Sequence, residues 1–456
     1  MGKLWDKGYT LDSLIEAFTV GNDYELDQSL VVADCLGSMA HARGLARAGI
    51  ISDDDAHALV DELLRIAHDA ANGSFLIRAQ DEDAHTAIEA ALTEALGDLG
   101  KRIHTGRSRN DQVITALRLY GRAAIWQVMD ATAETCDALF SLAEAHAQTP
   151  MPGRTHLQIA MPTTFGLWAA SVAEALTDDL ELLATARRLC DRGALGSAAS
   201  YGVPLPLDRA YTSDLLGFER LQNNVLAVNN SRGRLELAVL SALESILLTL
   251  SKMATDLILF SLPEIGYVSL PEGLCSGSSI MPQKRNPDGL ELLRSRSGVV
   301  GGYASTVRNI VRSLPSGYNR DFQDTKEPFL RGLAMTALAV RVAGRTIEAL
   351  EVHPERLVKA LVPEVYATDV ALDRVQGGES FRDAYRYVGT HLDDLGSYQF
   401  DTALERRTGI GMPGSPGFDT GREALGRLLE HERGRQRQAQ AALAALAGED
   451  LVISAL

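Results

Sequence analysis

Three long stretches of this 456-residue chain contain no proline: residues 110–149, 163–203 and 231–262. Proline in a helix interior removes a hydrogen bond and clashes with the preceding turn, so its absence leaves room for very long helices. In the third stretch, apolar residues recur at alternating steps of four and three, the heptad spacing that turns one apolar seam toward neighbouring helices. The seam consists of Val239, Leu243, Ile246, Leu250, Met253, Leu257 and Phe260. The spacing predicts a helix of a bundle.

Helix length constrains the fold further. At 1.5 Å per residue, a helix that filled 110–149 would span roughly 60 Å, which is more than an isolated small domain covers. We therefore expect the helices to associate in an oligomeric bundle. Two further helical stretches, about 289–314 and 329–350, bring the central helices to five, with no convincing strand among them. The predicted fold class is all-α.

The rest of the chain flanks this central region on both sides. The N-terminal part looks helical, and Ser52 is a good N-cap for a segment that begins at Asp53. The C-terminal part is polar and Arg-rich, with a Gly/Pro-rich stretch before a last helix at about 420–446. The sequence therefore predicts an N-terminal helical domain, a central long-helix domain that carries a loop at 274–288, and a smaller C-terminal helical domain: 1–106, 107–360 and 361–456.

Composition argues against several classes of protein. With 44 Lys+Arg against 60 Asp+Glu the formal charge is −16, which opposes binding to nucleic acid or anionic membranes. The segment from Met1 to Lys7 lacks the apolar stretch of a signal peptide, and no later uncharged apolar run approaches membrane-spanning length. The four cysteines stand singly, without the paired spacing of a zinc site or a disulfide framework. We expect a soluble cytoplasmic protein with reduced thiols.

One segment, residues 277–288, reads GSSIMPQKRNPD and sets two hydroxyls, a lysine and an asparagine between glycine and two prolines. Glycine permits backbone conformations that other residues avoid, and proline stops a helix from continuing, so this segment predicts a shaped loop. Helical character resumes at about Gly289, and the free N–H groups of a helix N-terminus favour an anion such as a carboxylate or phosphate. A plain turn between helices is the alternative, but twelve specified residues favour a catalytic loop.

A second polar cluster joins residues 81–86 with the run HTGRSRNDQ at 104–112, at the start of the first long helix. Arginine binds carboxylates through two parallel hydrogen bonds, so this helix start could clamp a dicarboxylate. As structure alone, Asn110 or Asp111 would be an N-cap and the arginines would be solvated surface. The segment by itself supports the two interpretations evenly.

Two more breaks between helices carry polar residues. Residues 152–158 contain His156, and a histidine in a polar break can transfer protons near neutral pH. A lone histidine is more often a surface or satisfied core residue. Residues 317–326 add a phenol, an amide and a lysine, and on their own form a polar turn between helices.

Together these motifs resemble the fumarase/aspartase superfamily, whose members cleave C–N or C–O bonds to release fumarate. Residues 277–286 match its loop signature. The run at 104–112, together with 81–85 and YNRDFQDTK at 318–326, is most similar to the argininosuccinate lyase branch. The resemblance implies a homotetramer whose central helices form a twenty-helix bundle, with each active site assembled from three subunits. It implies no metal and no organic cofactor.

The resemblance also implies catalytic roles. Ser278 would be the base that abstracts a proton from the substrate carbon beside a carboxylate. Because a serine hydroxyl is a weak base, backbone donors and a nearby cation must favour its ionised form, and Lys284 suits that role. Lys284 and Asn286 would stabilise the carbanion-like intermediate. His156, paired with Glu291, would position or protonate the leaving nitrogen.

The substrate implied by the resemblance is argininosuccinate, which a reversible β-elimination converts to arginine and fumarate. The residues expected to bind it are His85, Ser108, Arg109, Asn110, Thr155, Gln158, Asn286, Tyr318, Gln323 and Lys326. These residues are dispersed along the chain, and in the family such segments meet across subunits. We therefore expect the clusters to meet only in the oligomer.

Two departures from the commonest pattern of this branch concern the leaving group. An Asn-Ala-Ser stretch usually follows the N-terminal phenylalanine, whereas residues 18–23 read FTVGND and lack its serine. The usual Gly-Tyr-Thr-His is Gly-Arg-Thr-His at 153–156. A lyase for another N-substituted aspartate is therefore the main alternative, ahead of adenylosuccinate lyase.

Two other classes of function have less support. A structural role, such as that of the related lens crystallins, would tolerate loss of Ser278, His156 or Lys284, and all three are present. Nucleic-acid binding through Arg107 and Arg109 would be expected to come with interleaved aromatic residues, which the segment lacks.

Overall fold

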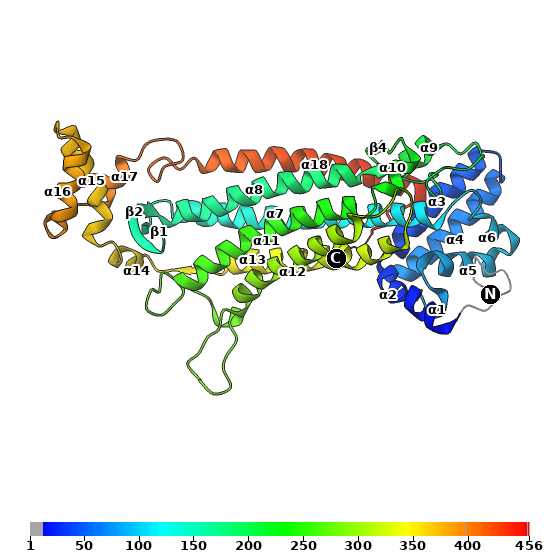
Figure 1. Cartoon of the computed structure of the whole chain (residues 1–456), viewed down its shortest axis with the longest axis horizontal. Coiled ribbons are helices and arrows are strands. Elements are labelled where there is room, and N and C mark those ends of the chain that lie inside the picture. Colours follow the sequence, from blue (N-terminus) through cyan, green and yellow to red (C-terminus); the bar gives the residue numbers. More distant parts are fainter. Residues whose placement is uncertain (1–11, 397, 454, 456) are drawn as a thin grey trace.

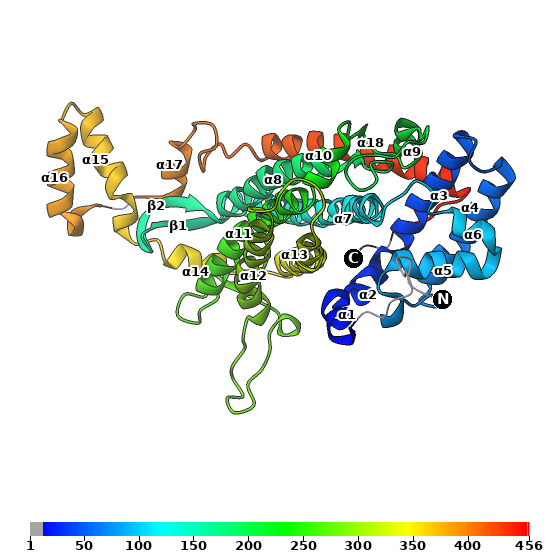
Figure 2. The same ribbon diagram turned by 45° about the vertical axis from the view of Figure 1, so that its right-hand side comes forward.

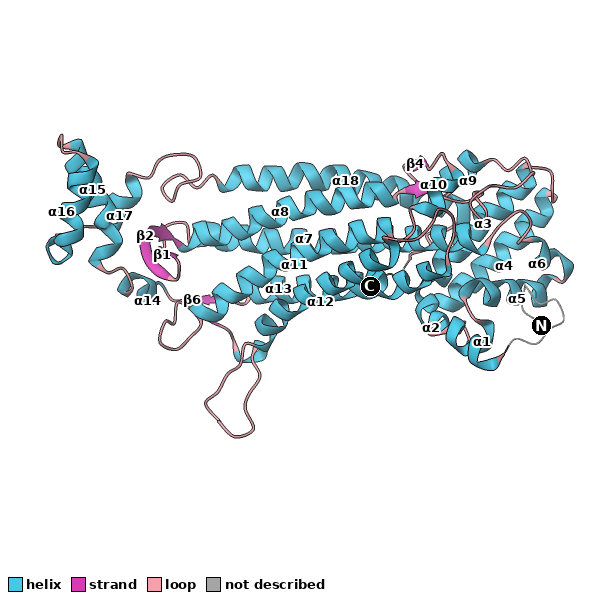
Figure 3. Cartoon of the chain, in the orientation of Figure 1, coloured by secondary structure: helices cyan, strands magenta, loops and turns pink. Residues whose placement is uncertain are grey.

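The computed structural model describes residues 12–396, 398–453 and 455. The expectation about Met1 to Lys7 lies outside these residues. The described chain is elongated, with a body of long helices between a group of short helices at each end (Figure 1). Helices make up most of its regular structure and the strands are short, which confirms the all-α class (Figure 3).

Five long helices form the body of the molecule, as predicted, and pack against one another along their lengths (Figure 1). Their bounds are α7 Arg109–Ala145, α8 Phe165–Cys190, α11 Arg234–Phe260, α12 Asp288–Val311 and α13 Lys326–Glu348. The predicted heptad seam of α11 is buried throughout, from Val239 at 0% exposed to Phe260 at 8%. The seam therefore forms part of the core between the helices, as its spacing predicts.

Glycines let α7 and α13 approach closely. A Cβ added to Gly121 of α7 would lie 2.7 Å from the ring of Phe329 of α13. Farther along the same contact, a Cβ on Gly344 of α13 would lie 2.8 Å from Oγ1 of Thr135. Side chains larger than hydrogen at these two positions would force the helices apart, and close-packed interiors accommodate such changes poorly.

Short helices precede the bundle. They are α1 Ser13–Val20, α2 Asp23–Asp27, α3 Val31–Arg47, α4 Asp53–Ala71, α5 Ala84–Leu96 and α6 Asp98–Arg102, with 3-10 turns at Gln28–Leu30 and Ala79–Asp81. Ser52 caps α4 as predicted, because its Oγ accepts a hydrogen bond from Asp55 N at 3.0 Å and the Asp55 carboxylate bonds back to Ser52 N. Figure 2 shows these helices gathered at one end of the bundle.

The break between α7 and α8 is a two-stranded antiparallel hairpin, β1 Pro150–Thr155 and β2 Gln158–Thr164, which the sequence analysis did not predict. Its tight turn places His156 and Leu157 at φ 53° and 62°. Such turns usually carry Asn or Gly at these positions. Since His-Leu lacks that signal, the hairpin was not recognisable from the turn.

After the bundle the chain first forms α14 Pro354–Lys359, α15 Ala367–Gln376, α16 Phe381–Thr390 and α17 Phe400–Glu405, and then α18 Phe418–Ala447. The first four lie at the end of the molecule opposite α3 to α6 (Figure 1). In contrast, α18 runs back along α7 and α8 and reaches α3. Buried Glu432 of α18 pairs with Arg187 Nε of α8 at 2.6 Å, which fixes α18 against the bundle.

The remaining elements connect these helices. They are α9 Arg209–Leu215, α10 Val225–Asn230 and the two-residue strands β3 Arg192–Gly193, β4 Arg220–Leu221, β5 Val268–Ser269 and β6 Glu351–Val352. All four cysteines are free thiols. The stretch Val225–Phe260 is long and apolar enough, by length and composition alone, to pass a test for a membrane span. It contains α11, whose seam packs inside the bundle.

We predict that His41 of α3 makes the fold sensitive to acid. His41 is 2% exposed and its Nε2 hydrogen-bonds the carbonyl of Thr105 at 3.0 Å. Burial, assisted by the charge of Arg107, lowers the pKa of His41 from 6.5 to about 3. The unfolded chain therefore takes up this proton at a higher pH than the folded chain. The free energy of unfolding should fall as the pH falls through that window.

His41→Gln keeps an N–H donor and cannot take up the proton. Between about pH 7 and pH 4, the free energy of unfolding measured with urea should therefore fall less steeply than in the unchanged protein. The matched control is His57→Gln, because His57 is exposed and bonds only the Asp53 carbonyl. An unaltered pH dependence in His41→Gln would show that this histidine is not the cause.

Candidate active site

The residues that the sequence singles out fall in three separate places. One place is an open pocket between α2, α5, the start of α7 and the segment before α13. The second is the turn of the β1–β2 hairpin, and the third is the loop that projects from the bundle between α11 and α12 (Figures 1 and 2). The predicted residues that line the pocket are His85, Arg109, Asn110, Tyr318, Gln323 and Lys326.

Ser108 fixes the start of α7 beside this pocket. Its Oγ accepts a hydrogen bond from Asn110 N at 3.2 Å, and its own N–H donates to Asp111 Oδ1 at 3.0 Å. The N-cap is therefore Ser108, and the structural expectation that Asn110 or Asp111 caps the helix is wrong, because the helix begins earlier. Asp111 Oδ2 also accepts from Gly196 N and Ala198 N, at 2.9 and 2.8 Å, and so holds a neighbouring loop.

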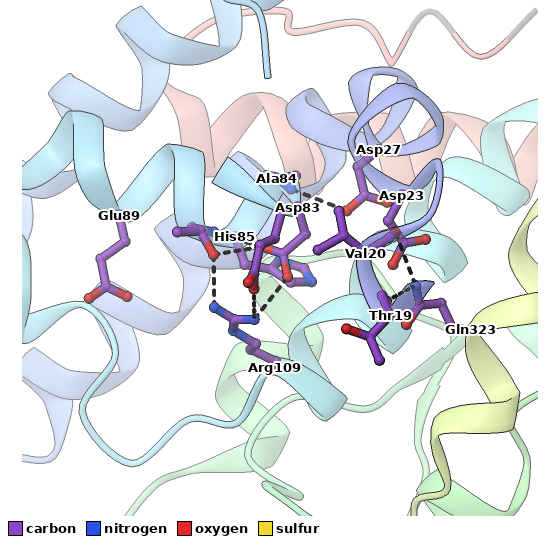
Figure 4. A network of polar contacts seen from close by, with 12 residues as sticks. Thr19, Val20, Asp23, Asp27, Asp83, Ala84, His85, Glu89, Arg109 and Gln323 are labelled. Atoms are coloured by element: carbon purple, nitrogen blue, oxygen red, sulfur yellow. Dashed lines mark hydrogen bonds and ion pairs between the residues drawn. The ribbon is translucent and has the colours of Figure 1, made fainter. Parts of the chain in front are cut away.

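Arg109 points into a polar network rather than into solvent (Figure 4). Its guanidinium donates to Thr86 Oγ1 at 2.8 Å, lies 3.2 Å from Asp83 and 3.4 Å from Glu82, and is 26% exposed. Arg107 is buried and donates to a serine hydroxyl of α3. Solvated surface is therefore the wrong interpretation of these arginines. Arg109 would have to exchange acidic partners to hold a substrate carboxylate.

Lys326 occupies the floor of the pocket. Its side chain is 3% exposed, and its Nζ lies 3.0 Å from Asp23 Oδ1 and 2.5 Å from Asp27 Oδ1. Burial lowers the pKa of Lys326, but the charges of Asp27 and Asp23 outweigh burial and leave it raised. Asp27 also accepts a hydrogen bond from Ala84 N at 3.1 Å, which ties α2 to the start of α5. The lysine is therefore charged and held in place.

The sequence analysis missed the residues that give the pocket its mixed charge. Four carboxylates line it beside the cations Arg109 and Lys326, and two more arginines complete the wall. These missed residues are Asp23, Asp27, Glu82, Asp83, Arg232 and Arg320. The only sequence signal was the acidic run directly before His85. In the part of the chain that is described, no group of three or more His, Cys, Asp or Glu is arranged to hold a metal ion.

The mouth of the pocket is formed by the segment that departs from the usual family pattern. Gln323 Nε2 donates to the carbonyl of Thr19 at 3.2 Å (Figure 4). Arg320 donates to the same carbonyl at 2.5 Å. Tyr318 is 38% exposed at the same mouth and packs near Phe322. The departure at residues 18–23 therefore lies where a ligand would enter.

The hairpin presents Thr155, His156 and Gln158 away from this pocket. Thr155 and Gln158 pair across the turn that contains His156. Arg154 donates to the Leu157 carbonyl at 3.1 Å and to Tyr267 Oη at 3.3 Å, which braces the turn against the end of α11. Non-glycine residues at positive φ persist where the surroundings hold them, and often mark functional sites.

The loop at 274–288 is closed at its neck. Ser276 and Asn286 exchange backbone hydrogen bonds of 3.1 and 2.8 Å, and the Asn286 amide donates to the Gly277 carbonyl at 3.3 Å. Within the loop, Ser278 Oγ accepts hydrogen bonds from Ile280 N at 3.3 Å and Met281 N at 3.1 Å. These donors would stabilise negative charge on the serine oxygen. Lys284 lies in the same loop, and Glu291 follows in the first turn of α12.

One chain does not bring these three places together. α7 has 37 residues, so roughly 55 Å of helix separates the pocket at its start from the hairpin beyond its end. The loop precedes α12 and projects from the bundle (Figure 2). In particular, His156 and Glu291 belong to different elements, and their predicted pairing is not formed within the described chain.

Comparison with known proteins gives the class. A family model described as Lyase matches residues 7–302. An argininosuccinate lyase of Sorangium cellulosum is 43% identical over 94% of this chain and 99% of its own length. One of Thermotoga neapolitana is 41% identical over 85% of this chain and 97% of its own. The chain therefore belongs to the lyase family, in the branch of the argininosuccinate lyases.

Solved structures agree on the fold. An EDDS lyase in complex with formate superposes with a TM-score of 0.81 at 22% identity, covering 96% of this chain and 95% of that one. A class II fumarase from Schistosoma mansoni superposes with a TM-score of 0.68 at 16% identity, covering 84% and 93%. At these identities the likeness concerns the fold.

We predict that Asp27 is more important for stability than Asp23. Asp27 is 1% exposed, whereas the Asp23 side chain is 15% exposed, and both pair with Lys326. Asp27→Asn removes the better-buried partner of a buried cation, so the free energy of unfolding should fall by about 3 kcal/mol. Asp23→Asn removes the same charge and should cost clearly less. Equal shifts of the urea midpoints in the two variants would contradict this assignment.

Proposed function

We propose that this protein is an argininosuccinate lyase, which cleaves a C–N bond of argininosuccinate to give arginine and fumarate in a reversible β-elimination. The observation that carries the proposal is the identity of 41 to 43% to argininosuccinate lyases over most of the chain. The loop and the pocket supply groups suited to this chemistry. The function belongs to arginine biosynthesis, and we propose a cytoplasmic location for it.

In the proposed reaction, Ser278 takes the proton from the carbon beside a carboxylate. The electron pair left on that carbon forms the C=C bond of fumarate as the C–N bond breaks, and the leaving nitrogen takes up a proton. The N–H groups of Ile280 and Met281, directed at Ser278 Oγ, favour the ionised serine. Lys284 and Asn286 would stabilise the carbanion-like intermediate, and His156 with Glu291 would serve the leaving nitrogen.

The pocket would hold the rest of the substrate. The proposed substrate combines carboxylates with a guanidinium and an ammonium group, and the pocket wall combines cations with four carboxylates. Charged hydrogen-bond partners of both signs therefore match both ends of such a molecule. The proposed binding residues are His85, Ser108, Arg109, Asn110, Thr155, Gln158, Asn286, Tyr318, Gln323 and Lys326.

The site would be completed by other subunits of a homotetramer. The length of α7 keeps the hairpin away from the pocket within one chain. An apolar groove between α12 and α13 supports association, because Leu292 is 51% and Leu338 64% exposed beside it. Two bundles that pack antiparallel would place the loop end of one beside the pocket end of the other. The division into domains 1–106, 107–360 and 361–456 belongs to the same proposal.

Fumarate release tests the function. Purified protein mixed separately with argininosuccinate, adenylosuccinate and aspartate should release fumarate, followed by ultraviolet absorbance, from argininosuccinate alone. Ser278→Ala should lower the rate by at least about a thousandfold, because a base in direct contact is lost, and should leave the oligomer intact. Silence on all three compounds would overturn the substrate and favour another N-substituted aspartate, which the departure at residues 18–23 of the pocket mouth already suggests.

Mixed oligomers test whether subunits share a site. Ser278→Ala inactivates the loop and Arg109→Gln the pocket, so each variant alone should be inactive. When the two are co-expressed, some sites receive an intact loop and an intact pocket from different subunits, and activity should return. Ser278→Ala co-expressed with Lys284→Met is the matched control, because both changes lie in one loop and no intact loop remains. No gain in the first mixture would contradict a shared site.

A further inference from the structure

We propose that Asp34 is a positioning residue that holds the His85 imidazole by Nδ1, so that its Nε2 faces the pocket as a charged hydrogen-bond donor to the substrate. This inference rests on the proposed function and adds a residue that the motifs did not suggest. Asp34 lies in α3, far from His85 in sequence, and does not line the pocket. It would act only through His85.

The geometry holds the Asp34 carboxylate firmly. Asp34 is 1% exposed, and its Oδ2 hydrogen-bonds His85 Nδ1. Its Oδ1 accepts from Gln112 Nε2 at 2.8 Å and from Ser38 Oγ at 3.4 Å. Partners on α3, α5 and α7 therefore fix this carboxylate from three helices. A carboxylate held in this way sets both the orientation of the imidazole ring and the nitrogen that it binds.

The other ring nitrogen is left for a ligand. His85 is in the first turn of α5, is 7% exposed and lines the pocket beside Arg109 (Figure 4). The described residues give its Nε2 no hydrogen-bond partner, whereas Nδ1 is taken by Asp34. Because His85 lines the pocket, a substrate oxygen there would supply a partner for Nε2.

The charges around His85 keep the ring protonated. Burial lowers the pKa of His85, but the carboxylates of Asp34, Asp83 and Asp27 outweigh burial and leave it raised. The cationic side chains nearby are Arg107, which faces Asp34, and Arg109, which pairs with Asp83. In contrast, burial lowers the pKa of His104 to about 4 and leaves it neutral near pH 7. With Asp34 ionised, both ring nitrogens carry hydrogen and Nε2 donates. Without that charge, burial would favour the neutral ring.

The rival explanation is that the pair only stabilises the N-terminal helices. Both explanations predict a less stable protein when Asp34 is changed, because a buried cation loses its partner. They differ in the pH dependence of substrate binding. Only a positioning role ties the protonation of His85 to kcat/KM, because a neutral His85 can carry its single hydrogen on Nδ1 and leave Nε2 as an acceptor.

The experiment compares the unchanged full-length protein, Asp34→Asn and Ser38→Ala. With argininosuccinate, kcat/KM of Asp34→Asn should fall by about tenfold or more at neutral pH, and this loss should shrink as the pH is lowered and the imidazole regains its proton. Ser38 bonds the same carboxylate from α3 but not His85, so the pH profile of kcat/KM in Ser38→Ala should match that of the unchanged protein. The double variant with His85→Asn and Asp34→Asn should have a kcat/KM no lower than that of His85→Asn alone. An unshifted profile in Asp34→Asn would overturn the proposal.

A second measurement separates this inference from the proposed function. In protein with ¹⁵N-labelled histidine, His85, assigned through His85→Asn, should keep its proton above about pH 6.5, the ordinary value for histidine, and lose this advantage in Asp34→Asn. If this result is found together with no turnover of argininosuccinate, the proposed substrate is rejected and the Asp34–His85 pairing stands. A His85 that titrates at or below about pH 6.5 in the unchanged protein would reject the Asp34–His85 pairing, whether or not Asp34→Asn folds.

Discussion

The length of α7 is the constraint on which the arrangement of this molecule depends. Its 37 residues begin at the cap that Ser108 and Asp111 form beside the pocket and end before the hairpin that carries His156. A helix of this length is rigid on the scale of a substrate, so the two groups of polar residues stay at opposite ends. The other long helices of the bundle, which have 23 to 27 residues, pack along α7 or along each other. Within the described residues, the three polar segments lie where long helices begin or end, and the length of α7 keeps the pocket and the hairpin apart in one chain.

The pocket shows how buried charge is managed at such a helix end. Lys326 has two carboxylate partners, Arg109 has two carboxylates and a hydroxyl, and His85 has Asp34 behind it. Ions taken out of water are costly unless opposite charges and hydrogen bonds surround them. The carboxylates that serve this purpose also give the pocket its capacity for cationic groups. The residues that balance buried charge here are therefore the same ones to which we assign ligand recognition.

Much of the fold was predictable because it follows from local rules. Absence of proline and the heptad seam of α11 indicated the long helices, and Ser52 marked the start of α4. The hairpin at 150–164 was missed because its turn uses His156 and Leu157 at positive φ, where Asn or Gly is usual. The assignment of Asn110 or Asp111 as the cap failed because Ser108, Asn110 and Asp111 lie within one turn and each could have served.

The sequence by itself determined the helical class, the position of the loop at 277–288 and the polar clusters, because periodicity and turn residues act over a few positions. It also named six residues that the fold gathers in one pocket. Only the tertiary structure decided that Asp23, Asp27 and Asp34 lie beside Lys326 and His85, since these contacts join residues that are 51 to 303 positions apart. Such pairings depend on how the helices cross, and helix crossing is set by the packing of many side chains at once.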